Sequence, residues 1–456
     1  MSHKIYAPNV HLFAFHFGNG SSNESSSRTD FDSELLWQKC SEIFAYFQIP
    51  QKLIIKPATE DYRVYLLAGE SENKALLPLS GKILLAGQET RITGFACPLQ
   101  IEKSYALALN IRIPQFDGTG EETEEIDISS FRNLNPANCF LPEQINSSLG
   151  QTLLITAWLS PQQQAEPSLW RVIADQCVQD FLGESKVNCP PLSQEDQLFG
   201  SPIFEYGTPY QNQTHGHLFV WFFFRPTVNT QSSSSSNSSD ENFSFFYQKL
   251  IDLCYLRQKI FKVYQLSRSL YEDIFTGHQQ IKVIINEVAR KTPVQQPSKT
   301  QNKTGSLSDS DLNYFQEQLK TLPQLALQYS DWRSDLERYR LIVDMSRKTY
   351  GERIRQIDER LPNNDLGFLV FFQEKTALQL QKEIEACIDS CAYSSNLVDK
   401  ALISIRGIVE IEQTQRERAL EEAMRDSETA SRTQDERLQS LIVLIIIGLC
   451  LVALFS

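Results

Sequence analysis

Positive charge is scarce in this sequence of 456 residues. Lysine and arginine together number 43, against 56 aspartate and glutamate residues, which gives a formal net charge of −13. Proteins that bind nucleic acids concentrate basic residues, because these neutralise the phosphates. The acidic balance therefore disfavours a nucleic-acid partner.

Cysteine pairs and targeting signals are also missing. The nine cysteines are odd in number and contain no C-x-x-C motif, which is typical of reduced, buried thiols rather than of a disulfide framework. The segment from Met1 to Pro8 has one lysine and no apolar run behind it, unlike a signal peptide. The sequence therefore predicts that the bulk of the chain is cytoplasmic.

The motifs of common nucleotide-binding and hydrolytic enzymes do not occur. The sequence has no G-x-x-x-x-G-K-[S/T], no H-E-x-x-H, no G-x-S-x-G, and no G-x-G-x-x-G after a strand. Gly18-Asn19-Gly20 follows a predicted strand, but no lysine or helix start comes at once, so a plain turn is favoured over a phosphate loop. We predict a protein that is not an enzyme and has no cofactor. An enzyme with an unfamiliar site in the first domain is the alternative.

Short apolar segments separated by glycine and proline dominate residues 1–228. About nine of them, from 11–17 to 217–224, have the composition and length of β-strands. Two others, 34–47 and 168–182, are predicted helices. The run from Leu218 to Phe224 is continuously apolar, which is typical of a central strand covered on both faces. The pattern predicts an α+β or α/β domain with a mixed sheet and helices on at least one face.

Long helical patterns replace the strands after a serine-rich linker at 229–242. Residues 243–362 are predicted to form a helical hairpin, in which Pro323 kinks or restarts the second helix. One position recurs every seven residues in each helix: Phe246, Leu253, Ile260, Ser267, Ile274, Ile281 and Val288, then Phe315, Leu322, Tyr329, Leu336, Val343, Tyr350 and Ile357. This spacing is typical of a coiled coil.

A third helix, 366–437, is predicted to complete an antiparallel three-helix coiled coil. Its core spacing of four and three residues continues to Val409. Beyond this point Glu412 and Arg416 occupy core positions, and the outer face carries many charges. The end of this helix is therefore predicted to be a charged stalk.

The last 19 residues, 438–456, form the most apolar part of the chain. Every residue from Leu441 to Phe455 is apolar or glycine, and a helix over 438–456 would rise roughly 27 Å, close to the ~30 Å hydrocarbon core of a membrane. Basic residues up to Arg437 precede it and none follows, in agreement with the positive-inside rule. We therefore expect a single-pass, C-terminal transmembrane helix, with the rest of the chain on the cytoplasmic side.

One acidic segment is a candidate metal site. Six carboxylates lie within eleven residues: Asp117, Glu121, Glu122, Glu124, Glu125 and Asp127. Such oxygen ligands suit a hard divalent cation, Mg²⁺ or Ca²⁺. Their spacing matches no EF-hand, so an acidic surface loop is the favoured interpretation and a weak cation site the alternative.

Other candidate residues have structural interpretations that are favoured over functional ones. His215 and His217 could place two imidazoles on one strand face, but no cysteine or carboxylate cluster accompanies them. Cys387 and Cys391 share a helix face and are assigned to the seam rather than to redox sensing. Three aromatic residues at helical spacing are likewise predicted to be core or seam residues: Tyr329, Trp332 and Tyr339.

The order of these parts resembles that of the CorA-type magnesium transporters, which have an α/β domain, two long antiparallel helices and a stalk helix that enters the membrane. That family's Gly-Met-Asn signature and second span have no counterpart here, since the segment ends at Leu451-Val452-Ala453-Leu454-Phe455-Ser456. No pore residue can therefore be assigned from the resemblance.

We predict a membrane-anchored cytosolic interaction or regulatory protein without catalysis. Its coiled coil would form a homo-oligomer or bind a partner protein, and its first domain would sense a ligand or bind protein. The alternative is a CorA-like oligomeric channel or transporter derivative with one span per subunit. In that case Gly448 and Cys450 are candidates for the face on which the spans meet, because small residues allow close packing.

Overall fold

The computed structural model describes residues 3–18, 29–57, 59, 61–68, 75–85, 87–183, 188–207, 216–224, 236–292 and 307–454, with the side chains of all but 29–33, 236–240 and 448–454. The chain divides into two compact units. Unit 1 consists of Met1–Arg268 and Arg338–Glu385, and unit 2 of Ser269–Glu337 and Ala386–Ser456.

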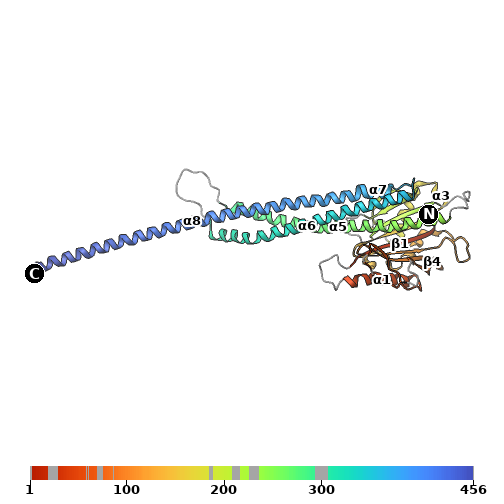
Figure 1. Cartoon of the computed structure of the whole chain (residues 1–456), viewed down its shortest axis with the longest axis horizontal. Coiled ribbons are helices and arrows are strands. Elements are labelled where there is room, and N and C mark those ends of the chain that lie inside the picture. The colour runs from red at the N-terminus through yellow and green to blue at the C-terminus, as the bar shows by residue number, and fades with distance from the viewer. Residues whose placement is uncertain are drawn as a thin grey trace. The chain divides into compact units, whose positions relative to one another are not determined.

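A mixed sheet forms the framework of unit 1 (Figure 1). The strands are β1 (Lys4–Phe17), β2 (Arg63–Tyr65), β3 (Leu77–Leu85), β4 (Gln88–Ile101), β5 (Ser104–Arg112), β6 (Ile126–Asp127), β7 (Gly150–Leu159), β8 (Leu192–Leu198), β9 (Ser201–Tyr206) and β10 (His217–Phe224). They lie in the order β2-β4-β5-β1-β7-β10-β9-β8, with β3 paired to β4 and β6 to β1. Among these described pairs only β7 and β10 are parallel, so the predicted mixed sheet is confirmed.

The position of each strand follows from its composition. β10 lies between β7 and β9, as its continuous apolar run predicts. β8 has no counterpart among the predicted strands, because its sequence, Leu-Ser-Gln-Glu-Asp-Gln-Leu, is mostly polar. It forms the edge of the sheet, where one side of the strand remains unpaired and polar side chains are tolerated.

One face of the sheet holds the hydrophobic core of unit 1. It packs against α1 (Thr29–Tyr46), α4 (Pro167–Leu182) and the 3₁₀ helix η1 (Ile128–Leu134). Alternate residues of the four central strands point to this face and are all apolar: Val10, Leu12, Ala14, Leu107, Leu109, Ile111, Leu153, Ile155, Ala157, Leu218, Val220 and Phe222. Burying each larger side chain stabilises the fold by about 1.5–3 kcal/mol.

The opposite face is covered by the first part of α5 (Ser236–Lys291), and Figure 1 shows α1 and α5 on opposite sides of the sheet. Tyr247 packs on Phe13 with ring centroids 5.7 Å apart, and Tyr255 packs on Phe15 at 5.6 Å. Gln258 Nε2 donates to the Gln151 carbonyl at 2.8 Å. Unlike the core face, this face carries polar side chains between its aromatic ones.

The remaining long helices are α6 (Asp309–Arg360) and α8 (Ala377–Leu454), the latter preceded by α7 (Gly367–Phe371) and one π-helical turn, η3 (Phe372–Thr376). Shorter helices are η2 (Pro136–Asn138), α2 (Pro142–Ile145) and α3 (Pro161–Gln164). Pro323 lies inside α6, which continues through it and does not restart there. α5 begins at Ser236, inside the predicted linker 229–242, of which residues 229–235 lie outside the described part.

Unit 2 buries the residues that recur every seven positions: Ile274, Ile281, Phe315, Leu322, Tyr329 and Leu336. Tyr329 Oη donates to the Ile274 carbonyl at 3.1 Å, and Lys291 Nζ pairs with Asp311 at 2.5 Å. In this unit α5 and α6 therefore run antiparallel, as predicted.

Glu412 and Arg416 meet the start of α6 within unit 2. Glu412 is 4% exposed and accepts a hydrogen bond from the Leu307 amide at 3.2 Å and one from Arg416 Nε at 3.0 Å. Arg416 also pairs with Asp309 at 2.6 Å and donates to the Leu307 carbonyl at 2.9 Å. The two charges at predicted core positions are thus satisfied by the backbone and by the first residue of α6.

The predicted transmembrane helix is wrong for the described part of the chain, where no helix has the length and apolar character needed to cross a membrane. The described apolar side chains of α8 near its end, 441–447, follow closely on Asp435, Glu436 and Arg437. The predicted single-pass anchor and membrane localisation are corrected accordingly. The side chains of 448–456 lie outside the described residues.

Candidate functional site

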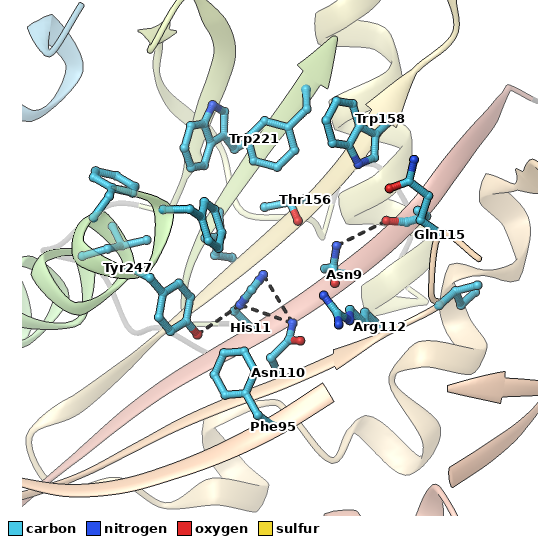
Figure 2. Close-up of a pocket in the computed structure, with 17 residues that line it drawn as sticks. Asn9, His11, Phe95, Asn110, Arg112, Gln115, Thr156, Trp158, Trp221 and Tyr247 are labelled. Carbon is cyan, nitrogen blue, oxygen red and sulfur yellow. Dashed lines mark hydrogen bonds between the residues drawn. The ribbon is translucent and has the colours of Figure 1, made fainter. Parts of the chain in front are cut away.

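A pocket of about 400 Å³ lies in unit 1 between α5 and the face of the sheet that α5 covers. Figure 2 shows its lining, which comes from β1, β4, β5, β7, β10 and α5 and from Ile113 and Gln115 after β5. The volume falls within the ~300–1,000 Å³ range of sites that hold small molecules. We call this cavity the sheet–helix pocket.

Strand register places the polar residues of its floor. Asn9 of β1 is paired with Arg112 of β5 on one side and with Thr156 of β7 on the other. Because side chains in register on one face lie side by side, these three residues form a row across three strands. His11 and Asn110 form the next row along the same strands.

His11 is held in this floor as a neutral imidazole. Its Nδ1 hydrogen-bonds with Tyr247 Oη at 3.1 Å, and Asn110 Nδ2 lies 3.3 Å from the same nitrogen. Burial, with a smaller contribution from the charge of Arg112, lowers the pKa of His11 to about 3. The imidazole therefore carries no charge at neutral pH.

Aromatic side chains form the walls. Phe243, Phe246 and Tyr247 come from α5, and Trp158 and Trp221 come from adjacent strands. Trp221 packs on Phe246 with ring centroids 5.8 Å apart. Such walls favour a ligand with a large apolar part, because burying apolar surface is favourable by about 25 cal/mol per Å².

An irregularity in β1 lies at one end of the pocket. The pairing of β1 with β7 shifts between Tyr6 and Asn9, and Ala7, which lines the pocket, has a φ of 43°. A non-glycine residue in the left-handed region is strained, and such residues and bulges occur often at functional sites. The bulge separates Asn9 and His11 from the first part of β1.

A second polar cluster in unit 1 is a buried ion pair. Arg257 of α5, 2% exposed, donates to Glu205 of β9, and His217 Nε2 donates to the same carboxylate at 2.8 Å. The guanidinium also lies 4.0 Å from the ring centroid of Phe372. Burial raises the pKa of Glu205, but Arg257 and His217 outweigh this effect and hold it at about 2. This cluster joins α5 to the sheet.

Four carboxylates of the predicted acidic segment, Asp117, Glu121, Glu122 and Glu124, are exposed, whereas Glu125 and Asp127 are half-buried and Asp127 belongs to β6. Asp117 Oδ1 accepts hydrogen bonds from Thr119 Oγ1 at 2.6 Å and from the Glu121 amide at 3.0 Å, and the Thr119 hydroxyl contributes most to lowering the pKa of Asp117. Asp127 caps η1 by accepting from the Ser129 amide at 2.9 Å. Within the described ranges, no three histidine, cysteine or acidic residues are grouped to hold a metal ion.

The other candidates from the sequence have varied outcomes. His217 belongs to the buried ion-pair cluster, whereas His215 lies outside the described residues, as do Asn19 and Gly20 of the predicted turn. In unit 2, Cys387 and Cys391 are buried, and Cys391 Sγ donates to the Tyr329 carbonyl at 3.4 Å. Trp332 packs edge-on against Tyr329 at 5.0 Å, and Tyr339 is half-buried in unit 1.

Sequence reasoning did not identify the sheet–helix pocket. A signal is nevertheless present, since polar residues occur at every second position within otherwise apolar strands: Asn9 and His11 in β1, and Asn110 and Arg112 in β5. Alternation of this kind places the polar residues of both strands on one face. Only the pairing of β1 with β5 brings them into the same rows.

No family model matches this chain, and neither curated proteins nor solved structures show a significant match to it. The resemblance to CorA-type transporters stays a prediction.

Proposed function

We propose that this chain is a non-catalytic regulatory protein whose unit 1 binds a small apolar molecule in the sheet–helix pocket. The observation that carries this proposal is the pocket itself: a cavity of about 400 Å³ with aromatic walls and a few polar groups placed by strand register. This combination is the usual form of a small-molecule site.

The polar groups of the pocket favour binding over catalysis. The residues that line it include no carboxylate, cysteine, serine or lysine. His11 is occupied by Tyr247 and Asn110 and has a pKa of about 3, so it is a poor proton acceptor near neutral pH. The Tyr247 hydroxyl lies beside this imidazole, but burial raises the pKa of Tyr247 well above its ordinary value, so the pair is poorly suited to nucleophilic catalysis.

The binding proposal is tested with N-phenyl-1-naphthylamine, a neutral apolar dye that fluoresces when bound. We expect the full-length chain to bind it with energy transfer from Trp158 and Trp221, which line the pocket. Thr156→Trp places an indole in the middle of the floor and should weaken binding at least about tenfold, whereas Thr90→Trp in β4, outside the pocket, should not. Equal binding by both variants, or none by the unaltered chain, would contradict the proposal.

We further propose that the helices of unit 2 form a coiled coil that associates with a second copy or with a partner protein. Residues at seven-residue spacing are buried there, while the described side chains of α8 from 417 to 447 are exposed. Leu420 and Met424 are apolar members of this exposed part, at 58% and 59%. Light scattering tests the proposal: the full chain should form an oligomer that Leu420→Glu with Met424→Glu weakens. A monomer at all concentrations that binds no partner would argue against it.

A further inference from the structure

Three hydrogen-bond donors gather at one end of the sheet–helix pocket, and we call them the donor end: the Arg112 guanidinium, the Thr156 hydroxyl and the Trp158 indole N–H. Figure 2 shows the Thr156 hydroxyl and the Trp158 ring nitrogen turned toward the side on which Asn9 and Arg112 lie. Thr156 is in register with Asn9, and Asn9 with Arg112. At ~4.8 Å between strands, the row spans about 10 Å.

These donors have unused hydrogen-bonding capacity. In the described part of the chain, neither the Thr156 hydroxyl nor the Trp158 indole N–H makes a hydrogen bond within the protein; Thr156 is 3% exposed, whereas Trp158 is partly exposed. Arg112 is an exposed residue that donates through Nε to Thr93 Oγ1 at 3.2 Å, and in the described part of the chain its guanidinium makes no ion pair. A ligand with acceptor atoms can therefore hydrogen-bond with this end of the pocket.

The free edge of Arg112 indicates which acceptor fits best. With Nε engaged by Thr93, the two Nη groups remain as a planar fork. This fork matches the two oxygens of a carboxylate. The lining contributes no acidic residue that would compete for it. The rest of the pocket, formed by aromatic residues of α5 and by Trp221, is apolar. The part of the ligand that lies there should therefore be apolar too.

We infer that the ligand of the sheet–helix pocket is a small hydrophobic carboxylate. Its carboxylate pairs with the Nη groups of Arg112, with Thr156 and Trp158 as further donors, and its apolar body packs against the aromatic residues of α5. This inference rests on the proposed binding function and specifies the chemistry of the ligand.

The experiment compares acids with their neutral counterparts on the full-length chain. Displacement of bound N-phenyl-1-naphthylamine is measured with two acid–alcohol pairs: dodecanoic acid with dodecanol, and 1-pyrenebutyric acid with 1-pyrenebutanol. The pair that binds more tightly shows whether the apolar part of the ligand is aliphatic or aromatic. We expect the acid of that pair to bind about tenfold or more tightly than its alcohol, because hydrogen bonds to charged groups are the stronger ones. Arg112→Gln should weaken binding of the acid until it no longer exceeds that of the alcohol. Arg112→Lys, which keeps the charge but loses the fork, should retain part of the preference for the acid.

Arg91→Gln is the matched control, because Arg91 is an exposed arginine on the neighbouring strand β4 and does not line the pocket. It should keep the full preference. Equal binding of acid and alcohol by the unaltered chain, or an undiminished preference in Arg112→Gln, would overturn the inference while leaving the binding proposal intact. Failure of the dye, the acids and the alcohols alike to bind would instead overturn the binding proposal itself.

Discussion

Replacing Glu205 with glutamine tests whether its ion pair with Arg257 anchors α5 to the sheet. Glu205 is 6% exposed and Arg257 2%, so the substitution leaves a guanidinium buried without its counter-charge. Removing one partner of a buried pair costs about 3–5 kcal/mol. The hydrogen bond from His217 survives, because glutamine keeps an acceptor oxygen. We therefore expect the free energy of unfolding of unit 1 to fall by most of this ~3–5 kcal/mol.

Urea unfolding followed by tryptophan fluorescence measures this loss. Trp332 is the only tryptophan of unit 2, so a Trp332→Phe background makes the signal report unit 1 alone. Glu195→Gln on the adjacent strand β8 is the control, since Glu195 is exposed and should change stability by less than about 0.5 kcal/mol. Adding Arg257→Met to Glu205→Gln should recover much of the loss, because neither charge then remains buried. A loss below about 1 kcal/mol, the value of a surface pair, would refute the reasoning.

Three further predictions concern single groups. His11 has a pKa of about 3 in the folded chain, below its ordinary 6.5, so its contribution to stability is present above pH 6.5 and is lost as pH falls toward 3. In His11→Asn, the free energy of unfolding in urea should therefore fall less between pH 6.5 and pH 3 than in the unaltered chain. Tyr247→Phe removes the hydroxyl 3.1 Å from His11 Nδ1 and should cost about 0.5–1.5 kcal/mol in the same assay; no loss would show that this contact is dispensable. Glu412→Ala removes the acceptor of the Leu307 amide and should speed its hydrogen exchange roughly fivefold or more, whereas Glu410→Ala, on an exposed residue, should not.

The sequence predicted elements better than sites. Residue composition located β10 as an inner strand and located the long helices nearly to their ends, since apolar runs and seven-residue spacing are local patterns. It did not predict β8, whose polar residues lie at a sheet edge. It also assigned a membrane span to 438–456, a prediction based on composition alone, which the described part of α8 contradicts.

The functional interpretation of single residues depended on hydrogen-bond partners that only the structure shows. Asp117 and its neighbours form a candidate cation site by density, yet the exposed Asp117 carboxylate accepts hydrogen bonds from Thr119 and from the Glu121 amide of its own loop. His217 was considered beside His215, but its hydrogen-bond partner is Glu205, and that carboxylate in turn pairs with Arg257 of α5. The pairing of Glu205 with Arg257, 52 residues away, cannot be predicted from local spacing.

By itself the sequence determined the mixed sheet, the long helices and the residues they bury, because periodic burial of apolar side chains is written in the order of residues. Only the tertiary structure decided where a ligand can bind. Asn9, Arg112 and Thr156 are separated by more than 40 residues from one another, and strand pairing places them side by side. α5 then covers that face and encloses the sheet–helix pocket, since register and helix docking are properties of the folded chain and not of any segment within it.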